Sequence, residues 1–187
     1  MRIIAGELRG INLYTPKNKK TRPLKDMVRG SIFNLLTHSN KISFQIKKSH
    51  ILDLYAGTGS FGLECISRSA NKVHFVEKEK DAATILEKNI EKLKVKEKTK
   101  IHYYDVFTLI KKKNIFDYKF DLIFCDPPYK ASNIDKLIEL IFVNNLLNKN
   151  GILVLHRHLI TKEGLPSCYE ILDTRTYGIS KVMFGKF

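Results

Sequence analysis

The chain has 187 residues, a formal net charge of +14, 43% hydrophobic residues and 28% charged residues, a composition typical of one soluble globular domain with a proper core. No apolar run approaches the ~20 residues of a membrane span, and the first residues lack the apolar stretch of a secretory signal. The three cysteines have no metal-ligand spacing. We therefore expect reduced thiols, no bound metal and a cytoplasmic protein.

The positive charge is concentrated at the N-terminal end. Residues 1–50 carry eleven Lys or Arg against two Asp or Glu, whereas the remaining 137 residues carry 22 against 17. A basic front on a nearly balanced body is the electrostatic pattern of a protein that binds a phosphate backbone. A solvated basic tail is the alternative interpretation, because runs of charge often interact only with water.

The basic region begins with two short β-like runs, Arg2–Ile4 and Ile11–Tyr14, which predict a hairpin. A proline-containing basic loop follows over residues 15–23. Apolar residues at helical spacing then predict a helix over Lys25–Thr37, which Gly30 weakens by roughly 1 kcal/mol relative to alanine.

The next segment joins a strand to a glycine-rich turn. Ile51–Tyr55 is apolar with one polar interruption and predicts a buried strand. It runs into three glycines at positions 57, 59 and 62, and Ser60 is placed to cap the following helix. Such glycines allow a tight turn, close approach of a ligand to the backbone and close helix–strand packing, while the helix directs free N–H groups at the ligand. Turn geometry alone is the alternative explanation of these glycines.

Strands and helices alternate over the rest of the chain. Further strands are expected over residues 73–77, 101–104, 120–125, 151–155, 169–174 and 181–187, and further helices over 61–68, 81–93, 106–112 and 134–143. This alternation predicts an α/β fold, Rossmann-like, with a seven-stranded, mostly parallel sheet and helices on both faces. We assign residues 1–40 to a small basic extension and residues 41–187 to the main domain.

Acidic residues stand at the ends of four successive predicted strands: Asp53, Glu77, Asp105 and Asp126. Ligands of such sheets bind beyond the carboxyl ends of the strands. Glu77 follows Gly57 by twenty residues, the spacing at which an acidic side chain binds ribose hydroxyls. With Asp53 at the end of the first strand in place of a phosphate-binding glycine motif, a cationic nucleoside without phosphates is favoured over a dinucleotide. S-adenosylmethionine has that chemistry.

A second distinctive turn, Asp126-Pro127-Pro128-Tyr129, follows the predicted strand over residues 120–125. It places an acid, two rigid residues and an aromatic ring at a strand end. A rigid loop without chemistry is the alternative, because prolines readily mark turns. We interpret Cys125, beside this turn, as a small buried hydrophobe and not as a nucleophile.

These residues resemble the class I S-adenosylmethionine-dependent methyltransferases, and more closely the bacterial 16S ribosomal RNA guanine-N2 methyltransferase family. The likeness covers essentially the whole chain. The segments that carry it are residues 2–6, 9–10, 21–23, 26–29 and 33–36, the turn at 53–64 and the turn at 126–129. The chain departs from the family pattern at Leu24, at Gly30 and at Leu155–His158, where an acidic residue would be expected.

The resemblance implies a class I methyltransferase fold and a role for each matching position. The implied cofactor-binding residues are Asp53, Tyr55, Ala56, Gly57, Thr58, Gly59, Ser60, Glu77, Lys78, Asp105 and Val106. Asp105 would meet the adenine, but a helix N-cap is an equally good interpretation of this residue. Asp126, Pro127 and Tyr129 would be catalytic, with two acceptors for the amino group and a ring that stacks on the base.

The implied substrate is 16S ribosomal RNA, in the small subunit or an assembly intermediate, with no obligate protein partner. The expected phosphate contacts are Arg2, Arg9, Arg22, Lys25 and Arg29. We treat His156 and His158 as surface residues, since strand alternation places them on one face. The alternatives are methylation of another planar nitrogen, adenine N6 or a glutamine amide, and a non-catalytic RNA-binding assembly factor.

Overall fold

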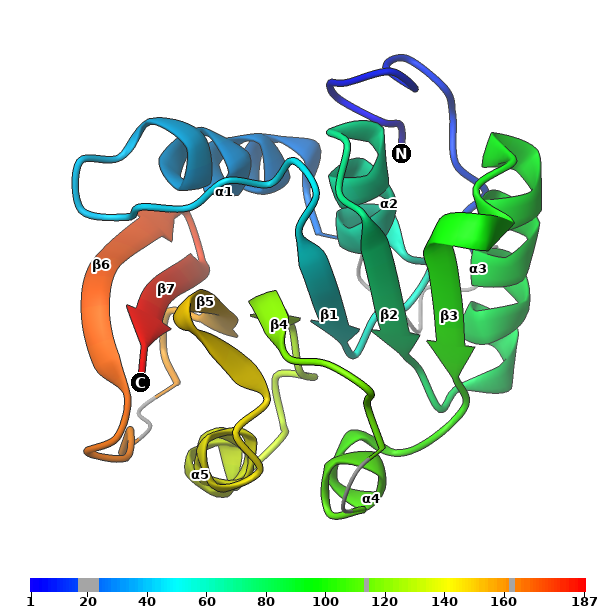
Figure 1. Cartoon of the computed structure of the whole chain (residues 1–187). Helices are drawn as coiled ribbons and strands as arrows, with labels where there is room; N and C mark the ends of the chain where they lie inside the picture. The colour runs from blue at the N-terminus through cyan, green and yellow to red at the C-terminus, as the bar shows by residue number, and fades with distance from the viewer. Residues whose placement is uncertain (17–23, 113–114, 162–163) are drawn as a thin grey trace.

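The computed structural model describes residues 1–16, 24–112, 115–161 and 164–187, and shows one twisted sheet with helices on both faces (Figure 1). The predicted arginine Arg22 lies outside these residues.

The sheet has seven strands in the order β3-β2-β1-β4-β5-β7-β6. Neighbours from β3 to β5 are parallel, whereas β7 is antiparallel to both β5 and β6. The strands are β1 (His50–Leu54), β2 (Lys72–Val76), β3 (Thr99–His102), β4 (Phe120–Cys125), β5 (Leu147–His158), β6 (Glu170–Tyr177) and β7 (Ser180–Lys186). The predicted fold class and strand number are confirmed.

Helices cover both faces of the sheet (Figure 1). They are α1 (Asp26–His38), α2 (Ser60–Ser67), α3 (Lys80–Leu93), the 3-10 turn η1 (Lys96–Lys98), α4 (Val106–Ile110) and α5 (Ile134–Val143). Two apolar clusters result because alternate strand residues face opposite sides. Ile51 packs in the cluster that contains residues of α1, α2 and α3, and Leu52 in the cluster that contains those of α4 and α5.

The N-terminal extension packs on the same core as the sheet. Ile32 and Phe33 of α1 are buried in the cluster that also holds Ile51 and Phe124. The extension therefore has no separate core within the described residues, and the domain boundary at residue 40 stays a prediction.

The predicted N-terminal hairpin is confirmed as an antiparallel pairing, though not as two strands: the Ile3 N–H donates to the Ile11 carbonyl at 3.0 Å, and the Leu13 N–H donates to the Met1 carbonyl at 2.9 Å. The two runs meet at a single antiparallel bridge, Arg2 to Asn12, and form no strands. The reason lies in the backbone donors, because side chains of α2 take them. The carboxylate of Glu64 accepts the N–H groups of Ile4 and Ala5, and the hydroxyl of Ser67 accepts that of Leu8. Donors used in this way are lost to a strand ladder.

Strand β5 is longer than predicted, running from Leu147 to His158 and not from 151 to 155. At its carboxyl end, pairing with β4 stops at Leu155, opposite Cys125, but pairing with β7 continues to His158, opposite Ser180. The strand therefore extends three residues beyond its parallel neighbour. These residues, His156, Arg157 and His158, stand at the edge where ligands of such sheets bind.

Candidate active site

The carboxyl ends of three adjacent strands meet at one rim. Leu54 at the end of β1 pairs with Val76 on one side and Cys125 on the other. The residues that follow, Tyr55, Glu77 and Asp126, therefore leave the sheet at the same level. Two of the predicted acidic residues, Glu77 directly after β2 and Asp126 directly after β4, thus flank the glycine turn after β1.

The glycine turn depends on left-handed backbone angles and on close packing of α2 against the sheet. Tyr55 has a positive φ of 59°, an uncommon conformation for a residue with a side chain and one that clusters at functional sites. Gly59, with φ 81°, is the N-cap of α2. Ser60 is therefore the first helical residue, and its predicted capping role is wrong, because no side chain caps this helix. A Cβ on Gly62 would lie 2.3 Å from the Phe75 ring, so glycine is required for helix–sheet packing.

Asp53 lies under this turn with only 1% of its surface exposed. One of its carboxylate oxygens accepts the Gly62 N–H at 2.9 Å. Burial raises the pKa of Asp53 well above 3.8, the Gly62 hydrogen bond opposes that rise, and the charges of Asp126 and Glu77 add to it. A positive ligand group at this rim would be stabilised by the neighbouring carboxylates of Glu77 and Asp126.

Glu77 is held rigidly at the end of β2. Its two carboxylate oxygens accept the Gly57 N–H at 2.7 Å and the Glu79 N–H at 2.8 Å, and the residue is buried. Each oxygen of a carboxylate can accept more than one hydrogen bond. Glu77 can therefore orient the glycine turn and still accept ligand hydroxyls.

Asp105 is the N-cap of α4, so this interpretation is confirmed. Its Oδ1 accepts the N–H groups of Phe107 at 3.0 Å and Thr108 at 3.3 Å, while Oδ2 lies 3.4 Å from the Lys78 ammonium. Val106 behind it is buried. The contact of Asp105 with adenine stays a prediction.

The Asp126 turn is held by the extended end of β5. His156 Nδ1 lies 2.7 Å from Asp126 Oδ1, and the Asp126 side chain is 25% exposed. The guanidinium of Arg157 donates to the carbonyls of Pro128 at 3.1 Å and Ala131 at 3.0 Å, and lies 3.5 Å from that of Pro127. The interpretation of His156 as a surface residue is wrong. It is 6% exposed because β7 flanks it and Asp126 bonds to it.

Tyr129 presents its ring at the surface of the same turn. The residue is 40% exposed, and its ring meets that of half-buried His158 edge to face, with 5.1 Å between ring centroids. A half-exposed aromatic ring beside a carboxylate can stack on a planar group that hydrogen-bonds to the acid.

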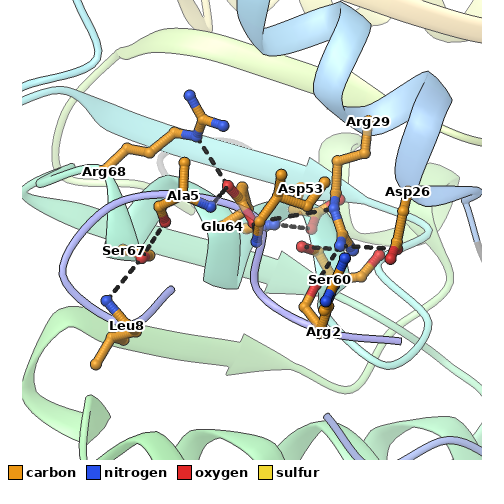
Figure 2. Close-up of polar contacts among 12 residues, drawn as sticks. Arg2, Ala5, Leu8, Asp26, Arg29, Asp53, Ser60, Glu64, Ser67 and Arg68 are labelled. Atoms are coloured by element: carbon orange, nitrogen blue, oxygen red, sulfur yellow. Dashed lines mark hydrogen bonds and ion pairs between the residues drawn. The ribbon is translucent and has the colours of Figure 1, made fainter. Parts of the chain in front are cut away.

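Of the predicted phosphate contacts, Arg2, Arg9 and Lys25 are exposed. Arg29 is not, and the prediction that it binds phosphate is wrong: its side chain is fully buried. Figure 2 shows its guanidinium between the N-terminal segment and α2, where it donates to the Arg2 carbonyl, to Asp26 at 3.0 Å and weakly to the Ser60 carbonyl at 3.5 Å. Burial lowers the pKa of Arg29, and the charges of Glu64 and Asp26 oppose that shift.

Glu64 is the counter-charge that the sequence reasoning missed. Its carboxylate is fully buried and accepts N–H groups of Ile4 at 2.7 Å, Ala5 at 2.9 Å and the Arg68 side chain at 2.9 Å (Figure 2). Arg29 Nε lies 4.0 Å away. The sequence offered one signal for this buried role: Glu64 is the one charged residue of α2, a short helix whose other side chains are apolar or small.

Asn89 of α3 is a second missed residue. It is fully buried, accepts the Tyr14 N–H at 2.7 Å, and donates to the carbonyls of Tyr14 at 3.2 Å and Thr58 at 3.1 Å. The N-terminal segment is thereby tied to the glycine turn.

Two further findings concern the part of the chain that the structure describes. Its residues include no group of three or more His, Cys, Asp or Glu placed to hold a metal ion. None of its helices is both long enough and apolar enough to cross a membrane.

Comparisons with known proteins agree with this architecture. The model of a family described as conserved hypothetical protein 95 matches residues 1–186. The ribosomal RNA small subunit methyltransferase D of Haemophilus influenzae is 32% identical over 180 residues, which cover 96% of this chain and 90% of that protein. The crystal structure of a candidate methylase from the same organism is 30% identical, with a TM-score of 0.77 and coverage of 98% and 96%. A candidate methyltransferase of Escherichia coli has a TM-score of 0.84 at 23% identity, with coverage of 99% and 96%.

Proposed function

The chain belongs to the family described as conserved hypothetical protein 95, and from that premise we propose that it transfers a methyl group from S-adenosylmethionine to the exocyclic N2 of a guanine in 16S ribosomal RNA. One observation carries the proposal. Asp53, Glu77 and Asp126 lie at the carboxyl ends of three adjacent strands, and the Glu77 carboxylate accepts the N–H of Gly57 in the glycine turn at 2.7 Å. A small-subunit ribosomal RNA as substrate is supported by the name of the Haemophilus influenzae relative.

The residues on the β1 and β2 side fit the methyl donor. When bound, S-adenosylmethionine supplies an electrophilic methyl group on a positively charged sulfur. Asp53 and the glycine turn through Ser60 would hold the methionine half, where the neighbouring carboxylates of Glu77 and Asp126 favour a cation. Glu77, oriented by the Gly57 and Glu79 amides, would accept the ribose hydroxyls. Lys78, Asp105 and Val106 would line the adenine.

The Asp126 turn fits the methyl acceptor. The lone pair of guanine N2 is delocalised into the ring, so the site must hold this nitrogen in position and stabilise the charge that it acquires. Asp126 and the carbonyl of Pro127 would accept its two N–H bonds, and the carboxylate would stabilise the developing cation. The exposed ring of Tyr129 would stack on the extruded base. Alignment of nitrogen, methyl and sulfur would supply most of the rate.

The exposed basic residues of the extension fit the RNA backbone. Arg2 and Arg9, with Asp26 and Met27, line a cleft of about 360 Å³ beside the buried Arg29. The RNA association constant falls with salt concentration, so log K against log salt has a negative slope. We expect Arg9→Ala to make this slope shallower by about 0.7 to 0.9, because one phosphate contact is lost. Lys149→Ala, at an exposed lysine near the amino end of β5, is the matched control. Equal slopes for the two variants would remove the extension from the RNA interface.

Two alternatives are separated by simple measurements. Methylation of adenine N6 or a glutamine amide would use the same turn, but the basic extension favours nucleic acid and the name of the Haemophilus influenzae relative favours small-subunit ribosomal RNA. A non-catalytic assembly factor would bind RNA without the methyl donor. Isothermal titration with S-adenosylmethionine tests this case, since absence of binding would favour it.

The decisive experiment is mass spectrometry of nucleosides from small-subunit RNA of cells with and without the protein. Loss of one N2-methylguanosine, restored by the wild-type chain and not by Asp126→Asn, is the expected result. An unchanged N2-methylguanosine content would refute the proposed acceptor.

A further inference from the structure

The end of β5 places a histidine beside the proposed acceptor-binding acid. Cys125 and Leu155 are paired in parallel register, so the residues that follow them, Asp126 and His156, are lateral neighbours. Pairing of His156 with Val182 of β7 keeps it in the sheet after β4 has ended. The position of His156 is therefore set by two strands and not by a loop.

The hydrogen bond between His156 and Asp126 determines which histidine nitrogen donates and which carboxylate oxygen stays available to a ligand. An ionised carboxylate only accepts hydrogen bonds, so the 2.7 Å contact requires that His156 Nδ1 carries the hydrogen and donates to Asp126 Oδ1. Oδ1 thus has a fixed partner, while the Asp126 side chain remains 25% exposed. Within the described residues, the second oxygen, Oδ2, has no hydrogen bond or ion pair that would compete with a ligand.

Packing alone does not explain a histidine at position 156. Its Nε2 is buried and has no hydrogen-bond partner among the described residues. A buried polar atom without a partner destabilises a fold, and an apolar side chain of similar volume would avoid that cost. Among the residues that the structure describes, the His156 side chain forms one hydrogen bond to another side chain, and its partner is Asp126.

We propose that His156 is the positioning residue of the acceptor site, which fixes the Asp126 carboxylate through Nδ1 so that Oδ2 receives the amino group of the substrate. This rests on the proposed function for its consequence in catalysis, but the positioning itself is a property of the free protein. Arg157 complements it by holding the Pro128 and Ala131 carbonyls, so that β5 sets both the acid and the backbone of the turn.

Three substitutions test the proposal with a built-in rescue. The amide nitrogen of an asparagine reaches the place of Nδ1, whereas that of a glutamine extends toward Nε2. His156→Asn therefore keeps the donor to Asp126, while His156→Gln and His156→Leu lose it. We expect His156→Leu and His156→Gln to lower kcat about 10- to 100-fold with KM for RNA and affinity for S-adenosylmethionine unchanged, because only alignment is lost. His156→Asn should retain most of the wild-type kcat.

Crystal structures of the wild type, His156→Leu and His156→Asn provide a readout independent of activity. We expect the Asp126 carboxylate to turn from its wild-type orientation in His156→Leu and to keep it in His156→Asn. The same Asp126 orientation in all three, or a wild-type kcat in His156→Leu, would overturn the inference. If His156→Leu does not fold, the Asn and Gln pair decides by the same criteria. A wild-type protein that methylates no small-subunit RNA would instead refute the proposed function, and the crystal structures would still test the positioning.

Discussion

Replacement of Glu64 by glutamine should weaken the whole fold, because this carboxylate joins the N-terminal segment, α2 and the buried Arg29. It accepts N–H groups from Ile4, Ala5 and Arg68, and Arg29 Nε lies 4.0 Å away. Glutamine has nearly the same shape but puts an NH₂ group in place of one oxygen. In either orientation that group faces a donor, so a donor loses its acceptor.

The size of the effect follows from what remains unpaired. A buried N–H group without a partner costs about 1–3 kcal/mol. Removal of one partner from a buried ion pair costs about 3–5 kcal/mol. Arg29 keeps Asp26 at 3.0 Å, although that carboxylate is 46% exposed, so the lower end applies. We expect the free energy of unfolding to fall by about 3 kcal/mol.

Urea unfolding followed by circular dichroism measures this change. With a urea slope of about 2 kcal/mol per molar, the midpoint should fall by roughly 1.5 M. Glu91→Gln, at an exposed position of α3, is the control and should stay within about 0.5 kcal/mol of wild type. Amide hydrogen exchange should accelerate more at Ile4 and Ala5 than in the sheet. Equal midpoints for the two variants would refute the assignment of Glu64 as the anchor of this segment.

Three other changes have defined outcomes. Gly62→Ala should lower stability by about 1–3 kcal/mol, measured in urea, because its Cβ would meet the Phe75 ring at 2.3 Å; an unchanged midpoint would contradict this packing. Burial lowers the pKa of His102 from 6.5 to about 4, so the unfolded chain binds a proton that the folded chain does not, and stability is lost as pH falls through this range. His102→Phe should reduce the resulting slope by about 1.4 kcal/mol per pH unit, measured as urea midpoints against pH, whereas exposed His38→Gln should not. Because the pKa of Asp53 is raised by burial, its charge is disfavoured in the fold at neutral pH. Asp53→Asn should therefore raise the free energy of unfolding by about 1 kcal/mol and abolish thermal stabilisation by S-adenosylmethionine; retained stabilisation would remove Asp53 from the donor site.

Local patterns were sufficient to predict most of the fold. The buried strand β4 was predicted with its observed bounds, Phe120–Cys125, because a short apolar run with turn residues on both sides has few alternatives. Helix α3 starts one residue before the prediction and ends at Leu93, since its apolar stripe is regular. The acidic residues after β2 and β4 were placed correctly at one rim because the strands before them were identified from their apolar runs.

Features that depend on distant partners could not be predicted in this way. An arginine in a basic region predicts a surface residue. Only the fold shows that Arg29 lies in the interior, close to the carboxylate of Glu64. The end of β5 depends on pairing with β7, which lies more than twenty residues later in the chain. The contact of His156 with Asp126 depends on that pairing and on the register with β4. No local periodicity contains this information.

The sheet order has a consequence for biosynthesis. β7 occupies the slot between β5 and β6 although it is the last of the described strands to be translated. Until it emerges, β6 has no neighbour in the sheet and the last three residues of β5 have none on either side. A nascent chain can thus assemble the half of the rim built on β1 and β2 first, while the half that holds Asp126 is completed only after β7 has been translated.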